Sequence, residues 1–306
     1  MAHFVIQNYH FGLKESVLDL YKAIKEKHQD IVFWWPGPEN TWDYVLCVKQ
    51  DHQLIAKAQI APITVIPDGS DSNFCHQIYL NMKVHPDWEL NTELKDHLFH
   101  AIYEKSLEMK EKLSSQYKTK LCFGNYSNEV IENKYLQSKG FIYEKSIVQM
   151  KRDLIEPIEE VKKPTEKIDV KEWKIEKEEE EKKYLEADLE IWPHAPIGIN
   201  RLRELKQSPL WTAITAFYKE EIVGSVIAWQ DEPNVGITEE VSVREKWRNQ
   251  GIARYLLSLA LNYLKKHDIE EAYLEVEVQN HSALHLYHSV GFEAVKEEQR
   301  YWMDLD

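Results

Sequence analysis

The amino-acid sequence predicts an α+β protein built from two successive domains, each a mixed, largely antiparallel β-sheet flanked by helices. Three observations lead to this prediction. The chain has 306 residues, enough for two domains of ordinary size. Strand and helix patterns occur in an order that repeats after about 150 residues. A charged segment with two prolines and no apolar periodicity, residues 154–171, separates the halves. We therefore expect domains at 1–153 and 172–306, joined by a solvated linker.

The first domain is predicted from alternating apolar strands and one long helical pattern. The helix after Asp87 carries Leu94, Leu98 and Ile102 on one face. A shorter helix is closed by Gly140-Phe141. We expect this shorter helix at 128–138 and a further helix at 14–27. Strands are expected at 4–6, 43–48, 54–66, 75–84, 120–123 and 147–150.

The second domain is predicted to begin with a helix, because the charged run 176–183 precedes apolar residues at helical spacing. We expect this run to be the exposed start of the helix, with Tyr184, Leu185 and Leu189 turned inward. An irregular loop follows at 191–196, where two prolines occur. Strands are expected at 210–218, 221–230 and 293–305.

Residues 235–260 predict a strand, a polar turn and a helix in succession. In the strand, Ile237, Glu239, Val241 and Val243 share one face by alternation. The turn ends at Gly251, where the backbone can approach a ligand closely, and the helix begins at Ile252. Because the first amides of a helix lack partners and carry the positive end of its dipole, this turn predicts a pocket for an anion, with a pyrophosphate as the expected ligand.

Two motifs connect this turn with a known family. Arg248, Gly251 and Ala253 form R-x-x-G-x-A, and Asn280 opens N-x-x-A-x-x-L-Y-x-x-x-G-F, whose other members are Ala283, Leu286, Tyr287, Gly291 and Phe292. In their order and spacing the motifs resemble the GNAT superfamily of acetyl-CoA-dependent N-acetyltransferases. The resemblance is strong over 235–292, looser over 172–234 and weakest over 1–153. It implies a tandem GNAT protein; because the two halves share little residue identity, the alternative is an unrelated α+β first domain.

The resemblance implies acetyl-CoA as co-substrate and no metal. The backbone of Val241, Ser242 and Val243 would hold the pantetheine arm, and an amide near Val241 would stabilise the oxyanion. The amides from Asn249 to Arg254 would cradle the pyrophosphate. The implied coenzyme-binding residues beyond the strand are Arg248, Asn249, Gln250, Gly251, Ile252, Ala253, Arg254, Asn280 and Tyr287.

The resemblance also implies two catalytic groups. Tyr287 is the candidate general acid for the departing thiolate, and its alternative role is packing on the coenzyme. Glu239, which shares strand parity with Val241, is the candidate base, acting through water. Glu240 is the alternative base and would face the other side of the sheet; both glutamates could instead be structural charges. A carboxylate base for an ammonium requires a pKa raised by burial.

The first domain departs from the family pattern wherever the two copies can be aligned. Without gaps from Val84 and Val243, Glu89 falls against Arg248, Thr92 against Gly251 and Leu94 against Ala253. Counted back from the Gly-Phe pairs, Glu129 falls against Asn280 and Leu136 against Tyr287. We expect a degenerate copy that retains the fold, covers the second domain or shapes the acceptor site, and binds coenzyme poorly.

Composition limits the partners. The net charge of −14 argues against non-specific nucleic-acid binding and favours cationic or neutral substrates. The three cysteines, Cys47, Cys75 and Cys122, form no C-x-x-C pair, and we expect reduced, core-packed thiols in the cytoplasm. The N-terminus lacks signal-peptide features, and no run approaches the length of a membrane span, so no membrane partner is expected.

The function predicted is transfer of acetyl from acetyl-CoA to a primary amine of a small molecule or peptide, by direct attack on the thioester. The alternatives are a non-catalytic acyl-CoA-binding or interaction protein that retains the fold, and an enzyme for a longer acyl chain. The resemblance places Trp192, His194 and Trp211 in the region that walls the acceptor cleft, although with ten tryptophans in the chain each Trp taken singly is more readily explained as a core residue.

Overall fold

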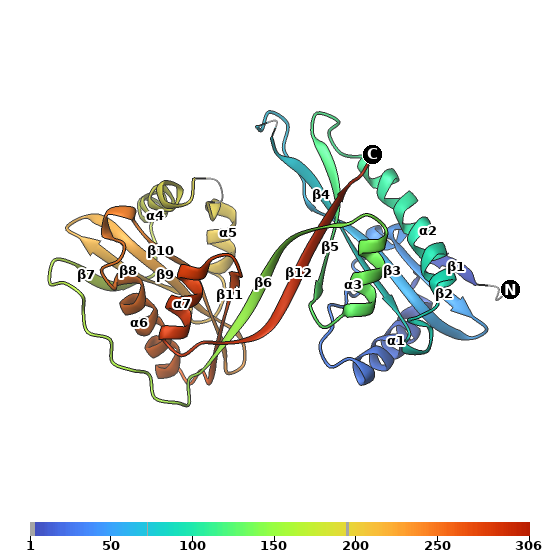
Figure 1. Ribbon diagram of the computed structural model, residues 1–306. Coiled ribbons are helices and arrows are strands. Elements are labelled where there is room, and N and C mark those ends of the chain that lie inside the picture. The colour runs from blue at the N-terminus through green and yellow to red at the C-terminus, as the bar shows by residue number, and fades with distance from the viewer. Residues whose placement is uncertain (1–3, 72, 194–195) are drawn as a thin grey trace. The chain divides into compact units, whose positions relative to one another are not determined.

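A computed structural model describes residues 4–71, 73–193 and 196–306 (Figure 1). The chain forms two compact units: unit 1 comprises Met1–Ser146 with Glu297–Asp306, and unit 2 comprises Ile147–Lys296. Each unit holds a mixed sheet with helices packed on it, which confirms the predicted α+β class. We describe each unit separately.

In unit 1 the strand order is β1-β2-β3-β4-β5-β12. Neighbouring strands pair antiparallel except β4 and β5, which pair parallel from Cys75↔Lys118 to Tyr79↔Cys122. The strands are β1 (Val5–Asn8), β2 (Val45–Gln50), β3 (Gln53–Thr64), β4 (Cys75–Val84), β5 (Lys118–Tyr126) and β12 (Glu293–Asp304). The helices are α1 (Lys14–Lys27), α2 (Thr92–Lys110) and α3 (Val130–Ser138). The predictions for 14–27 and 75–84 are confirmed to the residue.

In unit 2 the strand order is β6-β11-β10-β9-β8-β7. Only β10 and β11 pair parallel. The strands are β6 (Ile142–Asp153), β7 (Asp169–Trp173), β8 (Thr212–Tyr218), β9 (Glu221–Glu232), β10 (Val235–Val243) and β11 (Glu271–Glu277). The helices are α4 (Glu178–Ile191), α5 (Gly198–Leu205), α6 (Ile252–Lys266) and α7 (His281–Ser289). Helix α5 lies in a stretch for which the sequence analysis predicted no helix.

Each unit buries its own apolar core. In unit 2 the inward stripe of α6 includes Leu256, Leu257, Ala260 and Leu264, all fully buried at three- and four-residue spacing, as the periodicity predicted. In unit 1, Leu94, Leu98 and Ile102 of α2 are likewise fully buried. Cys47 and Cys122 are core residues, as expected, whereas Cys75 is half-buried.

The boundaries of the units differ from the predicted ones because two strands cross between them. Residues Ile147–Asp153 of β6 pair with β11 in unit 2, from Glu277↔Ile147 to Glu271↔Asp153. The last part of β12 pairs with β5 in unit 1, from Glu298↔Tyr126 to Asp304↔Lys120. Alternation in a sequence identifies a strand but does not identify its partner, so this exchange was not predictable.

The segment expected to be a solvated linker is packed against unit 2 instead. Its last residues begin β7, and Leu154 and Ile168 are buried at 1 % and 0 % exposure. Figure 1 shows this segment as the long connection from β6 to β7. The few apolar residues that anchor this segment were not recognised in the sequence, because they are widely spaced among charged residues and show no periodicity.

Equivalent elements recur at matching positions in the two units, which agrees with an internal duplication. The short 3-10 turn Pro86–Trp88 follows β4 as Glu245–Trp247 follows β10. Helices α3 and α7 begin one residue after Glu129 and Asn280, the pair that the alignment placed together. Each is followed by a glycine with positive φ, Gly140 at 102° and Gly291 at 86°.

Candidate active site

Strand β10 separates from its parallel neighbour β11 part of the way along. Their ladder runs only from Val235↔Glu271 to Ile237↔Tyr273, while β10 stays paired with β9 as far as Val243↔Gly224. The residues predicted to hold the pantetheine arm, Val241–Val243, lie beyond the end of this parallel ladder. Unit 1 has the same feature, because the parallel pairing of β4 with β5 ends at Tyr79↔Cys122.

A β-bulge in β10 changes the predicted orientation of its glutamates. The register with β9 shifts between Glu239 and Ser242, and Glu240 has a positive φ of 53°. Gly224 pairs with Val243 just beyond the bulge; a Cβ on it would come within 2.6 Å of the Ser242 carbonyl oxygen, so this close approach requires glycine there. Strict alternation, on which we expected Glu240 to face away from the site, therefore breaks at Glu240 itself.

Glu239 is held by two neighbours. Its Oε1 accepts a hydrogen bond from Trp229 Nε1 at 2.5 Å, and its Oε2 lies 3.7 Å from Arg201 Nη2. Burial raises the pKa of Glu239, while the Trp229 hydrogen bond and the Arg201 charge act against this rise. Both carboxylate oxygens thus already have partners within the protein.

Glu240 is the carboxylate with the more strongly changed acidity. Burial, followed by the charges of Asp188 and Glu239, raises its pKa to about 7. Asp188 lies on α4, is 5 % exposed, and accepts a hydrogen bond from the Ile197 amide at 2.7 Å. Burial also raises the pKa of Asp188. A group with a pKa near 7 is matched to proton transfer at neutral pH.

Tyr287 is 9 % exposed and belongs to the same buried cluster as Val243 of β10 and Val276 of β11. Burial and, second, the Glu240 carboxylate raise its pKa to about 12, so the phenol keeps its proton at neutral pH. Asn280 accepts a hydrogen bond from the Ala283 amide at 3.1 Å and so caps α7, the helix that carries Tyr287.

The predicted phosphate loop lies at the N-terminus of α6. Gly251 is the N-cap residue, with φ of 79°, and no side chain among the described residues caps this helix. Its first amides therefore remain available, and this fits a pyrophosphate. Arg248 donates from Nε to the Val243 carbonyl at 3.0 Å and Gln250 to the Lys246 carbonyl at 3.3 Å, so both brace the turn.

The other residues of the turn from Arg248 to Arg254 differ in burial, backbone conformation and contacts. Ile252 is buried and Ala253 packs against the core, so only their amides can face a ligand. Asn249 has a positive φ of 60°. Arg254 Nη2 contacts Glu159 Oε2 and the Ser289 carbonyl, each at 3.2 Å.

The two tryptophans expected near the acceptor, Trp192 and Trp211, differ in burial and do not share one environment. Trp211 is buried in the core beside α4 and α5, whereas Trp192 is 39 % exposed at the end of α4. His194 lies outside the described residues. The sequence analysis missed the functional relevance of Asp188, which raises the pKa of Glu240, and of Tyr184, whose own pKa Glu240 helps to raise. Their four-residue spacing on α4 was the available signal.

Helix α4 is also oriented differently from the prediction. Its buried residues are Glu181, Tyr184, Ala187 and Asp188, while Leu189 is 53 % exposed. Glu181, in the run expected to be exposed, accepts hydrogen bonds from Arg203 and Lys206, which lower its pKa. Ion pairing can thus turn a carboxylate inward in place of a leucine.

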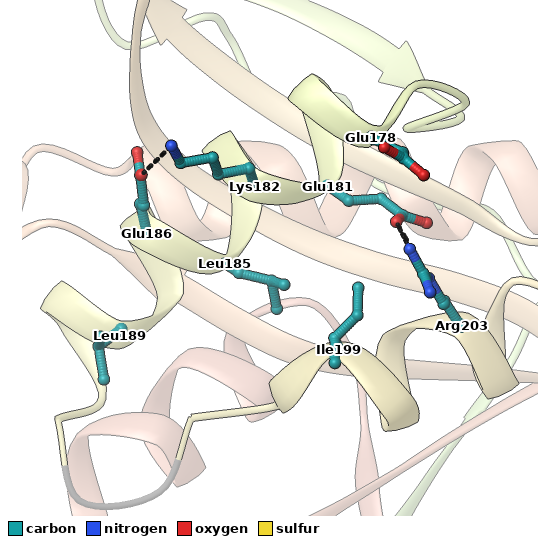
Figure 2. Close-up of a pocket in the computed structure, with 8 residues that line it drawn as sticks. All are labelled: Glu178, Glu181, Lys182, Leu185, Glu186, Leu189, Ile199 and Arg203. Atoms are coloured by element: carbon teal, nitrogen blue, oxygen red, sulfur yellow. Dashed lines mark hydrogen bonds and ion pairs between the residues drawn. The ribbon is translucent and has the colours of Figure 1, made fainter.

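Leu189 helps to line a pocket of about 420 Å³ between α4 and α5 (Figure 2). Leu185 and Ile199 supply the rest of its apolar surface, and the charged groups around it include Glu181 and Arg203. The lining contains none of the candidate catalytic residues, so this pocket is separate from the groups around Glu240.

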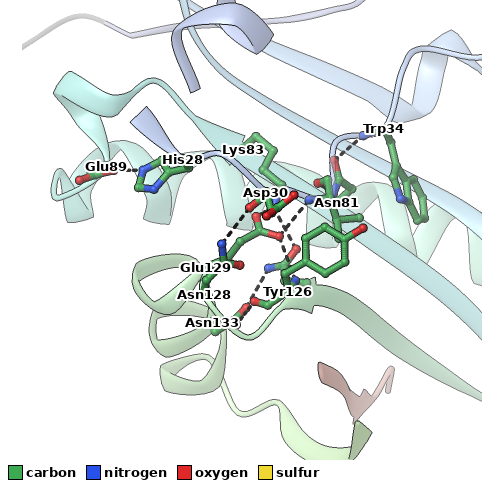
Figure 3. A network of polar contacts seen from close by, with 12 residues as sticks. His28, Asp30, Trp34, Asn81, Lys83, Glu89, Tyr126, Asn128, Glu129 and Asn133 are labelled. Atoms are coloured by element: carbon green, nitrogen blue, oxygen red, sulfur yellow. Dashed lines mark hydrogen bonds and ion pairs between the residues drawn. The ribbon is translucent and has the colours of Figure 1, made fainter. Parts of the chain in front are cut away.

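The corresponding region of unit 1 is filled by its own side chains and backbone (Figure 3). Lys83 of β4 is paired with Glu129 and donates to Asn125 Oδ1 at 3.0 Å. Glu129 accepts from the Val32 amide at 3.0 Å, and Asn81 accepts from the Trp34 amide at 3.1 Å. The segment after α1 is thus hydrogen-bonded where β4 and β5 have separated.

The N-terminus of α2 in unit 1 also differs from its counterpart, the N-terminus of α6 in unit 2. The side chain of Asn91 accepts a hydrogen bond from the Leu94 amide at 2.8 Å and caps α2. Glu89, aligned with Arg248, accepts hydrogen bonds from Lys27 and His28; burial acts to raise its pKa, but these bonds outweigh burial and lower it. A carboxylate and a capped helix replace the cation and the uncapped helix of unit 2.

Comparison with known proteins agrees with this geometry. The acetyltransferase (GNAT) family matches residues 169–292. An N-alpha-acetyltransferase from Saccharomyces cerevisiae, N-alpha-acetyltransferase 30, is 31 % identical over 132 residues, covering 40 % of this chain and 73 % of the relative. An N-alpha-acetyltransferase from Sulfurisphaera tokodaii is 29 % identical over 131 residues, covering 35 % of this chain and 78 % of the relative.

Solved structures extend the similarity to both units. A GCN5-related N-acetyltransferase from Sphaerobacter thermophilus has a TM-score of 0.76 at 18 % identity, covering 99 % of this chain and 96 % of that one. A tandem GNAT protein from the clavulanic acid biosynthesis pathway has a TM-score of 0.66 at 11 % identity, covering 99 % of both chains. At these identities the likeness supports the fold.

The separated parallel strands, the glycine turn and the helix after it define an acyltransferase fold. The chain belongs to the GNAT acetyltransferase family and is an N-acetyltransferase. Within the described residues, no cluster of three or more His, Cys, Asp or Glu could hold a metal ion, and none of the helices is long and apolar enough to cross a membrane.

Proposed function

We propose that unit 2 transfers the acetyl group of acetyl-CoA to the α-amino group of a peptide, with β10, the 248–254 turn and α7 forming the coenzyme site. Acetyl-CoA supplies an activated thioester carbonyl when it is bound. The uncapped amides at the start of α6 suit its pyrophosphate, and the β10 backbone beyond Ile237 suits the pantetheine arm. The family match over residues 169–292 supports this choice of co-substrate.

Glu240 is the proposed base, in preference to Glu239. Glu239 is held by Trp229 and Arg201, whereas burial and neighbouring negative charges bring the pKa of Glu240 to about 7. Glu240 would take a proton from the acceptor ammonium so that the amine can attack the thioester carbon. Tyr287, whose pKa of about 12 keeps its Oη protonated, would give a proton to the departing sulfur.

An α-ammonium gives up its proton more readily than a lysine ammonium, whichever carboxylate is the base. An α-ammonium has a pKa of about 8, so its proton transfer to Glu240 costs only ~1 to 1.5 kcal/mol. A lysine ammonium, with a pKa of about 10.4, would cost roughly 5 kcal/mol. The relatives named N-alpha-acetyltransferase support the same acceptor class.

The test is release of free coenzyme from acetyl-CoA with a panel of amines. The panel contains a peptide with a free N-terminus, the same peptide acetylated at its N-terminus but bearing a free lysine, and small primary amines. We expect turnover with the free N-terminus and little with the blocked peptide. Turnover with small amines alone would assign the acceptor to the small-molecule class. Binding of acetyl-CoA without turnover on any amine would favour a non-catalytic acyl-CoA-binding protein.

A further inference from the structure

We propose that the segment Leu154–Ile168, which we call the strap, forms a wall of the coenzyme site, and that its Lys162 and Lys163 bind the phosphate monoester of the coenzyme. The inference rests on the proposed use of a coenzyme A thioester. It concerns a part of the chain that lies outside the two sequence motifs. The sequence suggested only a solvated linker there.

The strap is fastened along the length of α6. Lys265, in the last turn of the helix, donates to the carbonyl oxygens of Ile155 at 3.2 Å and Glu156 at 2.9 Å. Ser258, in the middle, donates to the Glu159 carbonyl at 3.4 Å. Arg254, in the first turn, contacts the Glu159 carboxylate at 3.2 Å. The strap therefore runs antiparallel to α6, toward the helix N-terminus that carries the phosphate loop.

Apolar side chains hold both ends of the strap in the core of unit 2. Leu154 is 1 % exposed and Ile168 is fully buried, and Ile158 packs against the same core cluster as α6. Burial of side chains of this size stabilises by about 1.5–3 kcal/mol each. The path between these anchors is thus set by packing rather than by surface ion pairs alone.

The strap reaches the phosphate loop at Pro164. Its Cβ lies 3.8 Å from the position that a Cβ on Gly251 would take, which is van der Waals contact. Gly251 is the central glycine of R-x-x-G-x-A and the N-cap of α6. Lys163 directly precedes Pro164, and Lys162 is the next residue back, so two ammonium groups are attached to the backbone at this edge of the loop.

The order of charges along the strap favours an anion beside Pro164. Glu159 contacts Arg254 at 3.2 Å, and the two lysines follow it in the chain. Lys163 lies 3.3 Å from Glu166, whose side chain is 92 % exposed, and such a pair is weak enough to be exchanged for a better anion. Lys162 is exposed.

Coenzyme A has two distinct phosphate groups to accommodate. The helix start suits the pyrophosphate, because backbone amides there point at the ligand. The monoester on the ribose carries close to two negative charges at neutral pH, and lysine side chains can bind such a group as point charges. Lys162 and Lys163 directly precede Pro164 beside Gly251, whereas Arg254 also donates to the Ser289 carbonyl, so the strap lysines are the proposed partners for this group.

The experiment compares coenzyme A with 3′-dephospho-coenzyme A by calorimetric titration of the full chain. The variant replaces both lysines, Lys162→Ala with Lys163→Ala. The control replaces Lys182 of α4 and Lys266 at the far end of α6, both exposed, and so makes the same change in net charge. Thermal unfolding of all three proteins checks that they are folded.

We expect the wild-type protein to bind coenzyme A roughly tenfold or more tightly than the dephospho form, as two charge-assisted contacts would give. The double variant should lose most of this preference while its affinity for the dephospho form stays within a few fold, and the control should keep the preference. An unchanged preference, or an equal loss for both ligands, would overturn the role of the strap and leave the proposed function intact. Absence of binding of either ligand to the wild-type protein would overturn both.

Discussion

Glu240 occupies the bulged position of β10, and its backbone has a positive φ that non-glycine residues seldom adopt. Such strain persists where the surrounding structure enforces it, often at functional sites. Here the consequence is that Glu239 and Glu240 both lie in half-buried surroundings and interact with each other. Trp229 and Arg201 contact Glu239 directly, whereas the Arg201 charge acts on Glu240 only as a smaller influence that opposes the rise of its pKa.

The first prediction concerns the pH dependence of turnover. A base with a pKa of about 7 must be deprotonated, so kcat/KM should rise with pH up to about 7 and then level off. Glu240→Gln should remove this limb and lower kcat by roughly a hundredfold. Asp188→Asn removes a negative charge that raises the pKa of Glu240, so the limb should move to lower pH. Steady-state rates measured from about pH 5.5 to about 9 test the wild-type profile and both variants, because this range covers a group that titrates near neutral pH.

Glu239→Gln is the matched control for this prediction. It removes one carboxylate from the same strand while leaving Glu240 in place. A larger loss of turnover for Glu239→Gln than for Glu240→Gln would return the role of base to Glu239.

The second prediction concerns Tyr287. Tyr287→Phe keeps the ring that packs with Phe292 but removes the Oη proton, so kcat should fall by roughly a hundredfold or more. Affinity for acetyl-CoA should stay within a few fold, which is the pattern of a lost proton donor. Single-turnover rates and calorimetry separate the two effects. Equal chemical rates for both proteins would leave Tyr287 with packing alone.

At the scale of single elements, the third prediction concerns the turn that begins α6. Gly251→Glu places bulk and negative charge where the pyrophosphate is proposed to lie, so acetyl-CoA binding should be lost. Calorimetric titration measures it. Gly69→Glu is the control, because Gly69 has a similar φ of 84° and no atom within 4 Å of an added Cβ. Unchanged affinity in a folded Gly251→Glu protein would remove the basis of the site.

The two units share elements but differ in the residues that lie where the parallel strands have separated. In unit 2 the strand carries a bulge and two half-buried carboxylates. In unit 1 the pairing of β3 and β4 is regular from Ala56↔Val84 to Ala61↔Tyr79. The buried Lys83–Glu129 pair lies beyond the end of the parallel ladder of β4 with β5. Burying such a pair costs desolvation, so it persists where hydrogen bonds satisfy it fully, as Asn125 and the Val32 amide do here.

At the scale of the whole molecule, the fourth prediction concerns truncation. A fragment of residues 172–306 lacks the β6 residues that pair with β11, and it lacks the buried side chains of Met150, Leu154 and Ile168. Their loss removes ~5 to 9 kcal/mol, comparable with the whole stability of a domain. We expect this fragment to be unfolded and residues 147–296 to fold, as judged by urea unfolding followed by circular dichroism. Equal stability of the two fragments would contradict the exchange of strands.

The fifth prediction is one coenzyme per chain. In unit 1 the helix start is capped by Asn91, and the region beyond the parallel ladder is filled by Lys83, Glu129 and the segment around Val32. Titration of the full chain with acetyl-CoA should therefore give a stoichiometry of about one, as for a single helix-start site. Two equivalents of comparable affinity would indicate that unit 1 also binds coenzyme and that the ungapped alignment of the two copies is wrong.

The sequence by itself determined the features that depend on residues close together in the chain. The turn from Arg248 to Arg254 could be predicted because a glycine, a helix start and an apolar stripe are local signals. The equivalence of Asn280 and Glu129 in the two copies could likewise be found by counting back from the Gly-Phe pairs. The structure places both residues directly before a helix.

Only the tertiary structure decided which distant residues meet. The partners of β6 and β12 depend on pairing between remote strands, which alternation does not specify. The bulge at Glu240 depends on the register of β10 with β9, and one extra residue between Glu239 and Ser242 reverses the parity on which the choice of Glu239 rested. The pKa of Glu240 depends on its burial and then on the charge of Asp188, which approaches from helix α4. The strap follows α6 because a few buried side chains outweigh a charged composition, and burial is a property of the folded chain.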